Sequence, residues 1–200
     1  MKRGIASSRK DIEEIAVLLL EGFQEEFQAL NLPEVERSFV LRCLAEHILQ
    51  NHRDNLLIVR DKKIEGILFI KPKKWKGLKL LGRLFIQLNL QAFFKTCIFL
   101  VAFDHRSKAK EIHIDFIAVT KCNRGKGIGT QLIKLVKNLV KGDQYVTLYV
   151  SATNTAASRL YERLGFQIKK KGTSLIGRQY GIERSYFMEW KGIKNNENEV

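Results

Sequence analysis

The sequence predicts a single domain of the α/β class, in its α+β form, over residues 1–200. The chain is 45% hydrophobic and 28% charged, with 14 Gly and only 2 Pro, which is typical of a compact globular domain. Apolar residues recur at helical spacing in some segments and alternate along others that are rich in β-branched residues. The three cysteines are widely spaced and form no Cys-x-x-Cys pair, so no disulfide framework, zinc site or other metal is expected.

Helices and strands follow one another along the chain, each indicated by its own pattern. Ser8 or Asp11 suits the N-cap of a first helix, whose apolar positions continue to Phe23 at helical spacing. A second helix is expected after Pro33 and ends in the polar cluster 50–54. The later elements are strands at 55–59 and 64–70, a helical insertion at about 72–108, a strand at 111–120, a helix around 132–140, a strand at 145–151, a helix at 155–164, strands at about 166–170 and 183–190, and a frayed tail at about 194–200.

The formal net charge of +14 is the most unusual property of the composition. An excess of this size indicates an anionic partner, such as nucleic acid, an acidic membrane or a phosphate-rich small molecule. Residues 71–110 contain ten basic residues and one acid, Asp104, so this segment alone contributes +9. Its basic residues are Lys71, Lys73, Lys74, Lys76, Lys79, Arg83, Lys95, Arg106, Lys108 and Lys110.

The expected location of the chain is the cytoplasm. Acidic residues between Asp11 and Glu14 fall where a signal peptide would be apolar. The most apolar window, 84–103, has the length of a membrane span but contains Lys95 and several polar residues. We therefore expect neither secretion nor a membrane-spanning helix.

A glycine-rich turn, residues 124–130, lies between a predicted strand and a predicted helix. Its three glycines let a ligand approach the backbone N–H groups, and the following helix N-terminus favours an anion such as pyrophosphate. The P-loop pattern is absent, because no Lys-Ser or Lys-Thr pair follows. The dinucleotide fingerprint is also broken, since its third glycine would stand at Thr130.

Two motifs, in order, carry a resemblance to a known family. The spacing Arg124-x-x-Gly127-x-Gly129 follows a predicted strand, and Asn154-x-x-Ala157-x-x-Leu160-Tyr161 precedes Gly165-Phe166. Together they resemble the signature of the GNAT superfamily of N-acetyltransferases, over about residues 111–190. The resemblance implies the GNAT fold: a central mixed, mostly antiparallel twisted sheet with helices on both faces, in which the parallel strands 111–120 and 145–151 splay apart. The helical segment 72–108 has no counterpart in the minimal fold.

The resemblance also implies acetyl-CoA as the co-substrate, bound where the two parallel strands separate. Backbone N–H groups of the glycine-rich turn would hold the pyrophosphate, and those of Ile117 and Val119 would hold the pantetheine arm and polarise the thioester carbonyl. The expected acetyl-CoA-binding residues are Ile117, Ala118, Val119, Arg124, Gly125, Lys126, Gly127, Ile128, Gly129, Thr130, Asn154, Ala157 and Tyr161.

The resemblance implies that a primary amine attacks acetyl-CoA directly in a ternary complex. Three residues are candidates for catalysing this step. Strand alternation places His113 and Asp115 on the same face as Ile117 and Val119. His113 stands where a number of relatives carry a glutamate base, and Asp115 could orient a water or bind the ammonium group. Tyr161 would protonate the leaving thiolate. The alternative is that all three are structural residues of a strand and a core.

The acceptor amine is not identified by the sequence. Arg178, Tyr180 and Tyr186 lie near the last hairpin, which borders the acceptor pocket in relatives. Nucleic acid is not an expected partner, whereas contact of the basic insertion with an anionic membrane and a monomeric or homodimeric state remain open. The other functions left open are a non-catalytic acyl-CoA-binding domain of the same fold and a module that binds membranes or nucleic acid through the insertion.

Overall fold

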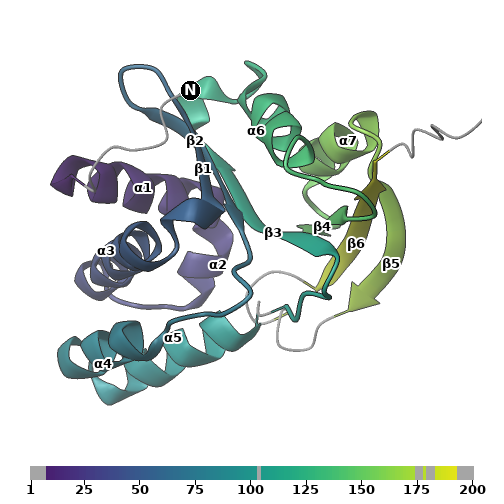
Figure 1. Ribbon diagram of the computed structural model, residues 1–200. Helices are drawn as coiled ribbons and strands as arrows, with labels where there is room; N and C mark the ends of the chain where they lie inside the picture. Colours follow the sequence, from purple (N-terminus) through teal and green to yellow (C-terminus); the bar gives the residue numbers. More distant parts are fainter. Residues whose placement is uncertain (1–7, 103–104, 174–177, 179–182, 193–200) are drawn as a thin grey trace, which may run out of the picture.

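A computed structural model describes residues 8–102, 105–173, 178 and 183–192, which share one sheet flanked by helices (Figure 1). The predicted frayed tail lies outside the described residues. The helices are α1 (Arg9–Gly22), α2 (Gln24–Ala29), α3 (Glu34–Asn51), α4 (Leu78–Gln87), α5 (Leu90–Ala102), α6 (Ile128–Lys137) and α7 (Thr155–Arg163), with short 3-10 turns at Arg53–Asn55 and Lys121–Asn123. The strands are β1 (Leu56–Arg60), β2 (Ile64–Ile70), β3 (Glu111–Val119), β4 (Tyr145–Ser151), β5 (Gln167–Thr173) and β6 (Arg184–Lys191).

Ser8, rather than Asp11, is the N-cap of α1. The Ser8 hydroxyl accepts from the Asp11 N–H at 3.1 Å, and the Asp11 carboxylate accepts in return from the Ser8 N–H, which forms a capping box. The buried Asp11 also pairs with Arg60 at the end of β1. The cap therefore ties the start of α1 to the sheet. The short helix α2, absent from the sequence prediction, follows α1 directly after Phe23.

The sheet is mixed and mostly antiparallel, which confirms the predicted fold class. Its strand order is β1-β2-β3-β4-β6-β5. The β3–β4 pair is parallel, and the other four neighbouring pairs are antiparallel. Parallel neighbours need a long crossover, which α6 provides between β3 and β4.

Two apolar cores lie on opposite faces of the sheet. One face carries α1, α2 and α3, with residues such as Ile15, Val40 and Phe69 fully buried. The other carries α6 and α7, which pack Leu132 and Ile133 against β3, β4 and β6. Figure 1 shows the two groups of helices on either side of the strands.

The insertion forms an additional layer of two helices on the first of these cores. Leu80 and Leu84 of α4 and Phe99 of α5 are buried in the same cluster as α1–α3, and the Phe99 ring lies 5.1 Å from that of Phe27 in α2. At the start of the insertion the Trp75 ring stacks on His52 with centroids 4.6 Å apart. None of the described helices is both long enough and apolar enough to cross a membrane.

A bulge in β3 corrects the predicted arrangement of its side chains. Opposite consecutive residues of β2, Phe69 and Ile70, the pairing in β3 skips from Phe116 to Ile114, so Asp115 is an extra residue. Side chains before and after the bulge therefore change sides. Ile114 and Ile117 both pack in the α6–α7 core, although they are three residues apart.

The prediction that His113 shares a face with Ile117 and Val119 is therefore wrong. His113 and Glu111 alternate with Ile112 and Ile114, which pack toward α6 and α7, so the two polar side chains face the other side of the sheet. Simple alternation could not reveal this, because it assumes an unbroken strand.

We expect Gly66→Ala to destabilise the fold and to disturb the start of α6. A Cβ atom at Gly66 would lie 2.6 Å from Cγ2 of Ile128, the first residue of α6, and 3.3 Å from the carbonyl oxygen of Ala118. Overpacking of this kind costs about 1–3 kcal/mol. Chemical unfolding monitored by circular dichroism measures the change.

Gly82→Ala is the matched control for that substitution. Gly82 lies on the exposed side of α4 with no atom within 4 Å of the added Cβ, so alanine should stabilise the helix by up to about 1 kcal/mol. Equal unfolding midpoints for the two variants would contradict the tight contact between β2 and α6.

Candidate active site

The parallel strands β3 and β4 separate part-way along their length. They pair from Glu111 opposite Tyr145 to Ile114 opposite Leu148, and no further. Beyond this point β3 stays paired with β2, while β4 stays paired with β6 as far as Ser151. The second half of β3 therefore faces a gap in the hydrogen-bonded ladder, as the splayed strands of the predicted fold require.

The backbone of β3 presents donors to this split. The Thr120 N–H donates to the Glu65 carbonyl of β2 at 3.0 Å, so Thr120 is turned toward β2. Alternation along the segment after the bulge then turns the N–H groups of Ile117 and Val119 away from β2, toward the split. These are the two donors that, by the resemblance to the GNAT superfamily, are expected to hold the acetyl-CoA arm.

The glycine-rich turn ends in an uncapped helix N-terminus beside the split. Gly125 and Gly127 adopt φ of 80° and 85°, the left-handed region that glycine enters without strain. The first N–H with an acceptor inside α6 belongs to Gln131, which donates to the Gly127 carbonyl at 3.0 Å. Within the described chain, the N–H groups of residues 128–130 have no acceptor. This turn can bind an anion through backbone groups and the helix dipole.

The two basic side chains of the turn have different surroundings. Arg124 donates to the carbonyl oxygens of Val119 and Glu21, at 3.2 and 2.8 Å, and so ties the turn to β3 and α1. Lys126 is exposed and donates to Asn123 at 3.0 Å. Arg124 thus shapes the turn, while Lys126 keeps its ammonium group at the surface.

Asn154 and Tyr161 belong to α7 and its N-cap, on the same side of the sheet as α6. Asn154 is the N-cap of α7 and accepts from the Ala157 N–H at 3.1 Å. Tyr161 is 8% exposed, and burial raises the pKa of its phenol to about 12. Its ring packs on Phe166, and its hydroxyl has no hydrogen-bond partner among the described residues. Tyr161 is therefore a protonated phenol at neutral pH.

A buried polar cluster occupies the opposite face of β3, beside β4. Thr147 donates its hydroxyl proton to Glu111, and the same hydroxyl oxygen lies 2.8 Å from Nδ1 of His113. Because Thr147 has a single proton to give, the network assigns the hydrogen of His113 to Nδ1. Nε2 of His113 then carries the lone pair. Glu111 also accepts from the Lys108 N–H and contacts Nε2 of His105 at 2.9 Å.

Burial and neighbouring charges set the ionisation of this cluster. Burial alone would raise the pKa of Glu111, but hydrogen bonds from Thr147, the Lys108 N–H and His105 outweigh it and lower that pKa. Burial, assisted by the charges of His105 and Lys71 and opposed by Glu111, lowers the pKa of His113 to about 3. At neutral pH Glu111 is therefore a carboxylate and His113 is a neutral imidazole.

The bulge residue Asp115 lies at the margin of this cluster. Its carboxylate is 3.7 Å from the ammonium group of Lys71, and both side chains are largely shielded from solvent. Lys71 also donates its backbone N–H to the His113 carbonyl at 2.8 Å. A cation is thus placed next to the candidate base.

His105, Glu111 and His113 also offer three donor atoms within 4.8 Å of one another, a set that metals can use. The two imidazole rings are stacked, however, with centroids 3.9 Å apart and an angle of 29° between their planes. A metal ion lies in the plane of each imidazole that binds it. Two stacked rings meet that condition poorly. The Thr147 hydroxyl also already forms hydrogen bonds with His113 and Glu111, two of the three possible metal ligands.

The sequence profile of the acetyltransferase (GNAT) family matches residues 20–166. The chain belongs to the GNAT family of acetyltransferases. Solved structures share the fold: an N-acetyltransferase from Staphylococcus aureus Mu50 has a TM-score of 0.66 at 17% identity, covering 92% of this chain and 98% of that one. The ribosomal-protein-S18-alanine N-acetyltransferase of Escherichia coli has a TM-score of 0.52 at 15% identity, covering 98% and 97%.

Two curated relatives align over shorter stretches. A mycothiol acetyltransferase of Corynebacterium efficiens is 35% identical over 69 residues, which are 34% of this chain and 23% of the relative. An uncharacterized N-acetyltransferase of Methanocaldococcus jannaschii is 39% identical over 61 residues, 29% of this chain and 39% of the relative. The chain therefore spans well under half the length of these relatives.

For this GNAT protein the structure brings together most, but not all, of the predicted site residues. The glycine-rich turn, the second half of β3 and α7 lie around the split. Arg178 is exposed, Tyr186 is half-buried in β6 beneath the Lys171 ammonium group, and Tyr180 lies outside the described residues.

Three further residues of the cluster, Glu111, Thr147 and His105, were not singled out by the sequence. The contact of Glu111 with Thr147 depends on the parallel pairing of β3 with β4, and no local motif marks it.

His113 should make the stability of the protein depend on pH. The pKa of His113 in the folded protein, about 3, is below its ordinary value of about 6.5. Between these two pH values the unfolded chain therefore binds a proton that the folded chain does not bind. The resulting contribution is fully present above about pH 6.5 and is lost as the pH falls toward 3. From about pH 7 to about pH 5 it amounts to about 2 kcal/mol.

Urea unfolding of wild type and His113→Gln at both pH values measures this contribution, because the histidines outside this cluster affect both proteins equally. The wild type should lose about 2 kcal/mol more than the variant on acidification. An equal loss would show that His113 titrates normally in the folded protein.

Proposed function

We propose that this protein is an acetyl-CoA-dependent N-acetyltransferase that acetylates a primary amine by direct attack in a ternary complex. The observation that carries the proposal is the uncapped N-terminus of α6 beside the split between β3 and β4. Backbone donors there lack acceptors in the described part of the chain, and nothing lies within 4 Å of a Cβ built at Gly125 or Gly127. An anion with a narrow, extended arm fits this arrangement.

The residues present fit acetyl-CoA along the length of the split. N–H groups of residues 127–130 would hold the pyrophosphate, with Lys126 adding positive charge at the surface. N–H groups of Ile117 and Val119 would hold the extended arm and face the thioester carbonyl. Asn154 and Ala157 form the N-terminus of α7, which supplies the opposite wall.

Bound acetyl-CoA supplies a thioester, whose acetyl carbon accepts the amine lone pair while the carbon–sulfur bond breaks. The chain must then take one proton from the amine and give one to the departing sulfur. Neutral His113 offers its Nε2 lone pair for the first of these tasks. Asp115 supplies a carboxylate for an ammonium group or a bridging water beside it.

Glu111 and Thr147 would act on His113 as positioning residues. As Nε2 gains a proton, the Nδ1 proton can move toward Thr147 and the Thr147 proton toward Glu111. The excess charge is then shared with a carboxylate rather than left on a buried imidazolium. Such a relay would keep the imidazole neutral while the amine gives up its proton.

Tyr161 is the proposed acid for the departing sulfur. Its hydroxyl is unpaired among the described residues, its phenol is protonated at neutral pH, and it lies in the core that lines the α6–α7 side of the split. A general acid of this kind contributes roughly 10²-fold or more to the rate.

Tyr161→Phe should therefore lower turnover about 100-fold, while the dissociation constant for acetyl-CoA changes less than about threefold. Turnover is followed as thiol release across a panel of amino acids, aminoglycosides, polyamines and peptides, which also identifies the acceptor. The matched control is Tyr145→Phe in β4, next to Lys191. Acetyl-CoA binding without acetylation of any amine in the panel would instead support a non-catalytic acyl-CoA-binding protein.

Gly127→Ala should weaken acetyl-CoA binding more than it weakens the fold. Alanine strains a backbone at φ of 85° by roughly 1–2 kcal/mol, and relief of that strain turns the N–H groups at the start of α6 away from the split. Calorimetric titration with acetyl-CoA should show at least a tenfold weaker affinity. Unchanged affinity would contradict the role given to this turn.

A further inference from the structure

The insertion exposes an unusual amount of apolar side-chain surface. Nine of the twelve large hydrophobic side chains that are exposed among the described residues lie between residues 75 and 101. They define what we call the α4–α5 surface: Trp75, Leu78, Leu81, Phe85, Ile86, Leu90, Phe94, Ile98 and Val101. Leu78, Ile86 and Val101 are 87%, 77% and 73% exposed. Burial in the fold of this chain therefore does not account for their apolar character.

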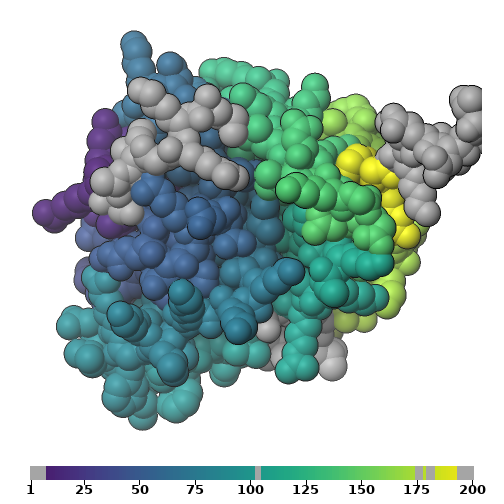
Figure 2. Space-filling view, in the orientation of Figure 1, coloured from purple at the N-terminus to yellow at the C-terminus, as the bar shows by residue number. Residues whose placement is uncertain are grey.

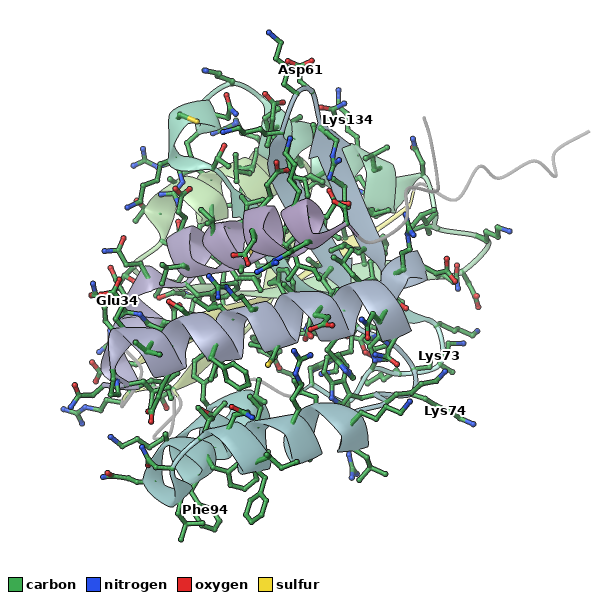
Figure 3. All side chains as sticks on the ribbon, turned by 90° about the vertical axis from the view of Figure 1, so that its left-hand side faces the viewer. Glu34, Asp61, Lys73, Lys74, Phe94 and Lys134 are labelled. Carbon is green, nitrogen blue, oxygen red and sulfur yellow. The ribbon has the colours of Figure 1, made fainter. Side chains whose placement is uncertain are left out.

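The two helices are already anchored through their other side. Leu80, Leu84, Leu88 and Ala92 are buried against the α1–α3 core, and Arg83 pairs with Glu46 of α3. Asn89, between the helices, donates to Glu36 of α3. Both helices therefore have two apolar sides, and only one of these sides packs against the rest of the described chain. Figure 2 shows the insertion as the lower left lobe of the molecule, and in Figure 3 Phe94 lies at its lower end, away from α3.

Positive charge is concentrated at the start of this apolar surface. Residues 71–101 contain seven basic residues and no acid. Among the described residues, no carboxylate forms an ion pair with Lys73, Lys74, Lys76, Lys79 or Lys95. Lys73 and Lys74 project from the edge at the start of the insertion (Figure 3). An apolar strip bordered by cations is the pattern of helices that lie in the interface of an anionic bilayer.

We propose that the α4–α5 surface docks the protein onto a bilayer that contains anionic phospholipid. The apolar side chains enter the boundary between headgroups and acyl chains, and the five unpaired lysines meet the lipid phosphates. With 10 and 13 residues, α4 and α5 extend about 15 and 20 Å, too short to cross a bilayer, so they lie along its surface.

Charge also argues for a bilayer rather than a second copy of the chain. A twofold interface brings the same patch of both copies together, so both copies would add positive charge to the contact. The segment carries no acid that could pair with the lysines. An anionic headgroup layer supplies the missing countercharge and accepts the apolar side chains at the same time.

The test is sedimentation of the full chain with vesicles of phosphatidylcholine alone or with 30% phosphatidylglycerol. Wild type should bind the anionic vesicles at least tenfold more strongly than the neutral ones, and less strongly as salt is raised. The double variant Ile86→Ser/Phe94→Ser should lose at least tenfold in binding. Both positions are exposed, so the variant should fold, which its thermal unfolding midpoint checks.

Two matched charge variants separate a local surface from the overall charge. Replacing Lys73, Lys74, Lys76 and Lys79 by Gln, and replacing Lys62, Lys63, Lys169 and Lys170 by Gln, each removes four charges from exposed lysines. The first variant should lose at least tenfold in vesicle binding, and the second less than about threefold. Equal losses would overturn the proposal.

Sedimentation equilibrium without vesicles supplies the remaining decisive outcome. A wild-type dimer that becomes monomeric on Ile86→Ser/Phe94→Ser, together with no binding to anionic vesicles, would assign the surface to contact between copies and overturn the proposal. The proposal does not rest on acetyl transfer, since none of these residues belongs to the site around the split.

Discussion

The extra residue at Asp115 in β3 is the constraint on which the arrangement of the site depends. A strand without a bulge would send His113 and Ile117 to the same side of the sheet. The bulge instead directs Ile117 and Val119 to the α6–α7 core and leaves His113 beside Thr147 and Glu111 on the other face. In the proposed mechanism, this one strand would hold the acetyl donor along its open edge and keep the proton-handling groups on the face behind it.

The two faces of the sheet also divide the charges of the molecule. On the α6–α7 side, the proposed anion site consists of backbone N–H groups and a helix dipole, because Arg124 donates to carbonyl oxygens. Residues 71–110, which include the insertion packed against α2 and α3, carry +9 of the +14. The CoA pyrophosphate would therefore use little of the positive charge of the chain.

Local signals in the sequence were sufficient for most of the fold. Ser8 at the start of α1, the glycine-rich turn before α6 and Asn154 at the start of α7 act through neighbours a few residues away, so their patterns are readable. The bulge and the Glu111–Thr147–His113 network depend on which strands pair and in which register. Such long-range pairing leaves no mark in a single sequence, and α2 was missed because six residues are too few to show a period.

The parting of β3 and β4 also bears on how the sheet avoids other chains. Unpaired strand backbone at the outside of a sheet can recruit a neighbouring molecule and begin aggregation. Here the unpaired stretches face each other within the sheet, because β2 and β6 occupy their outer sides. The protein thus carries an internal edge, which has paired strands on both of its outer sides and adds no further edge at the outside of the sheet.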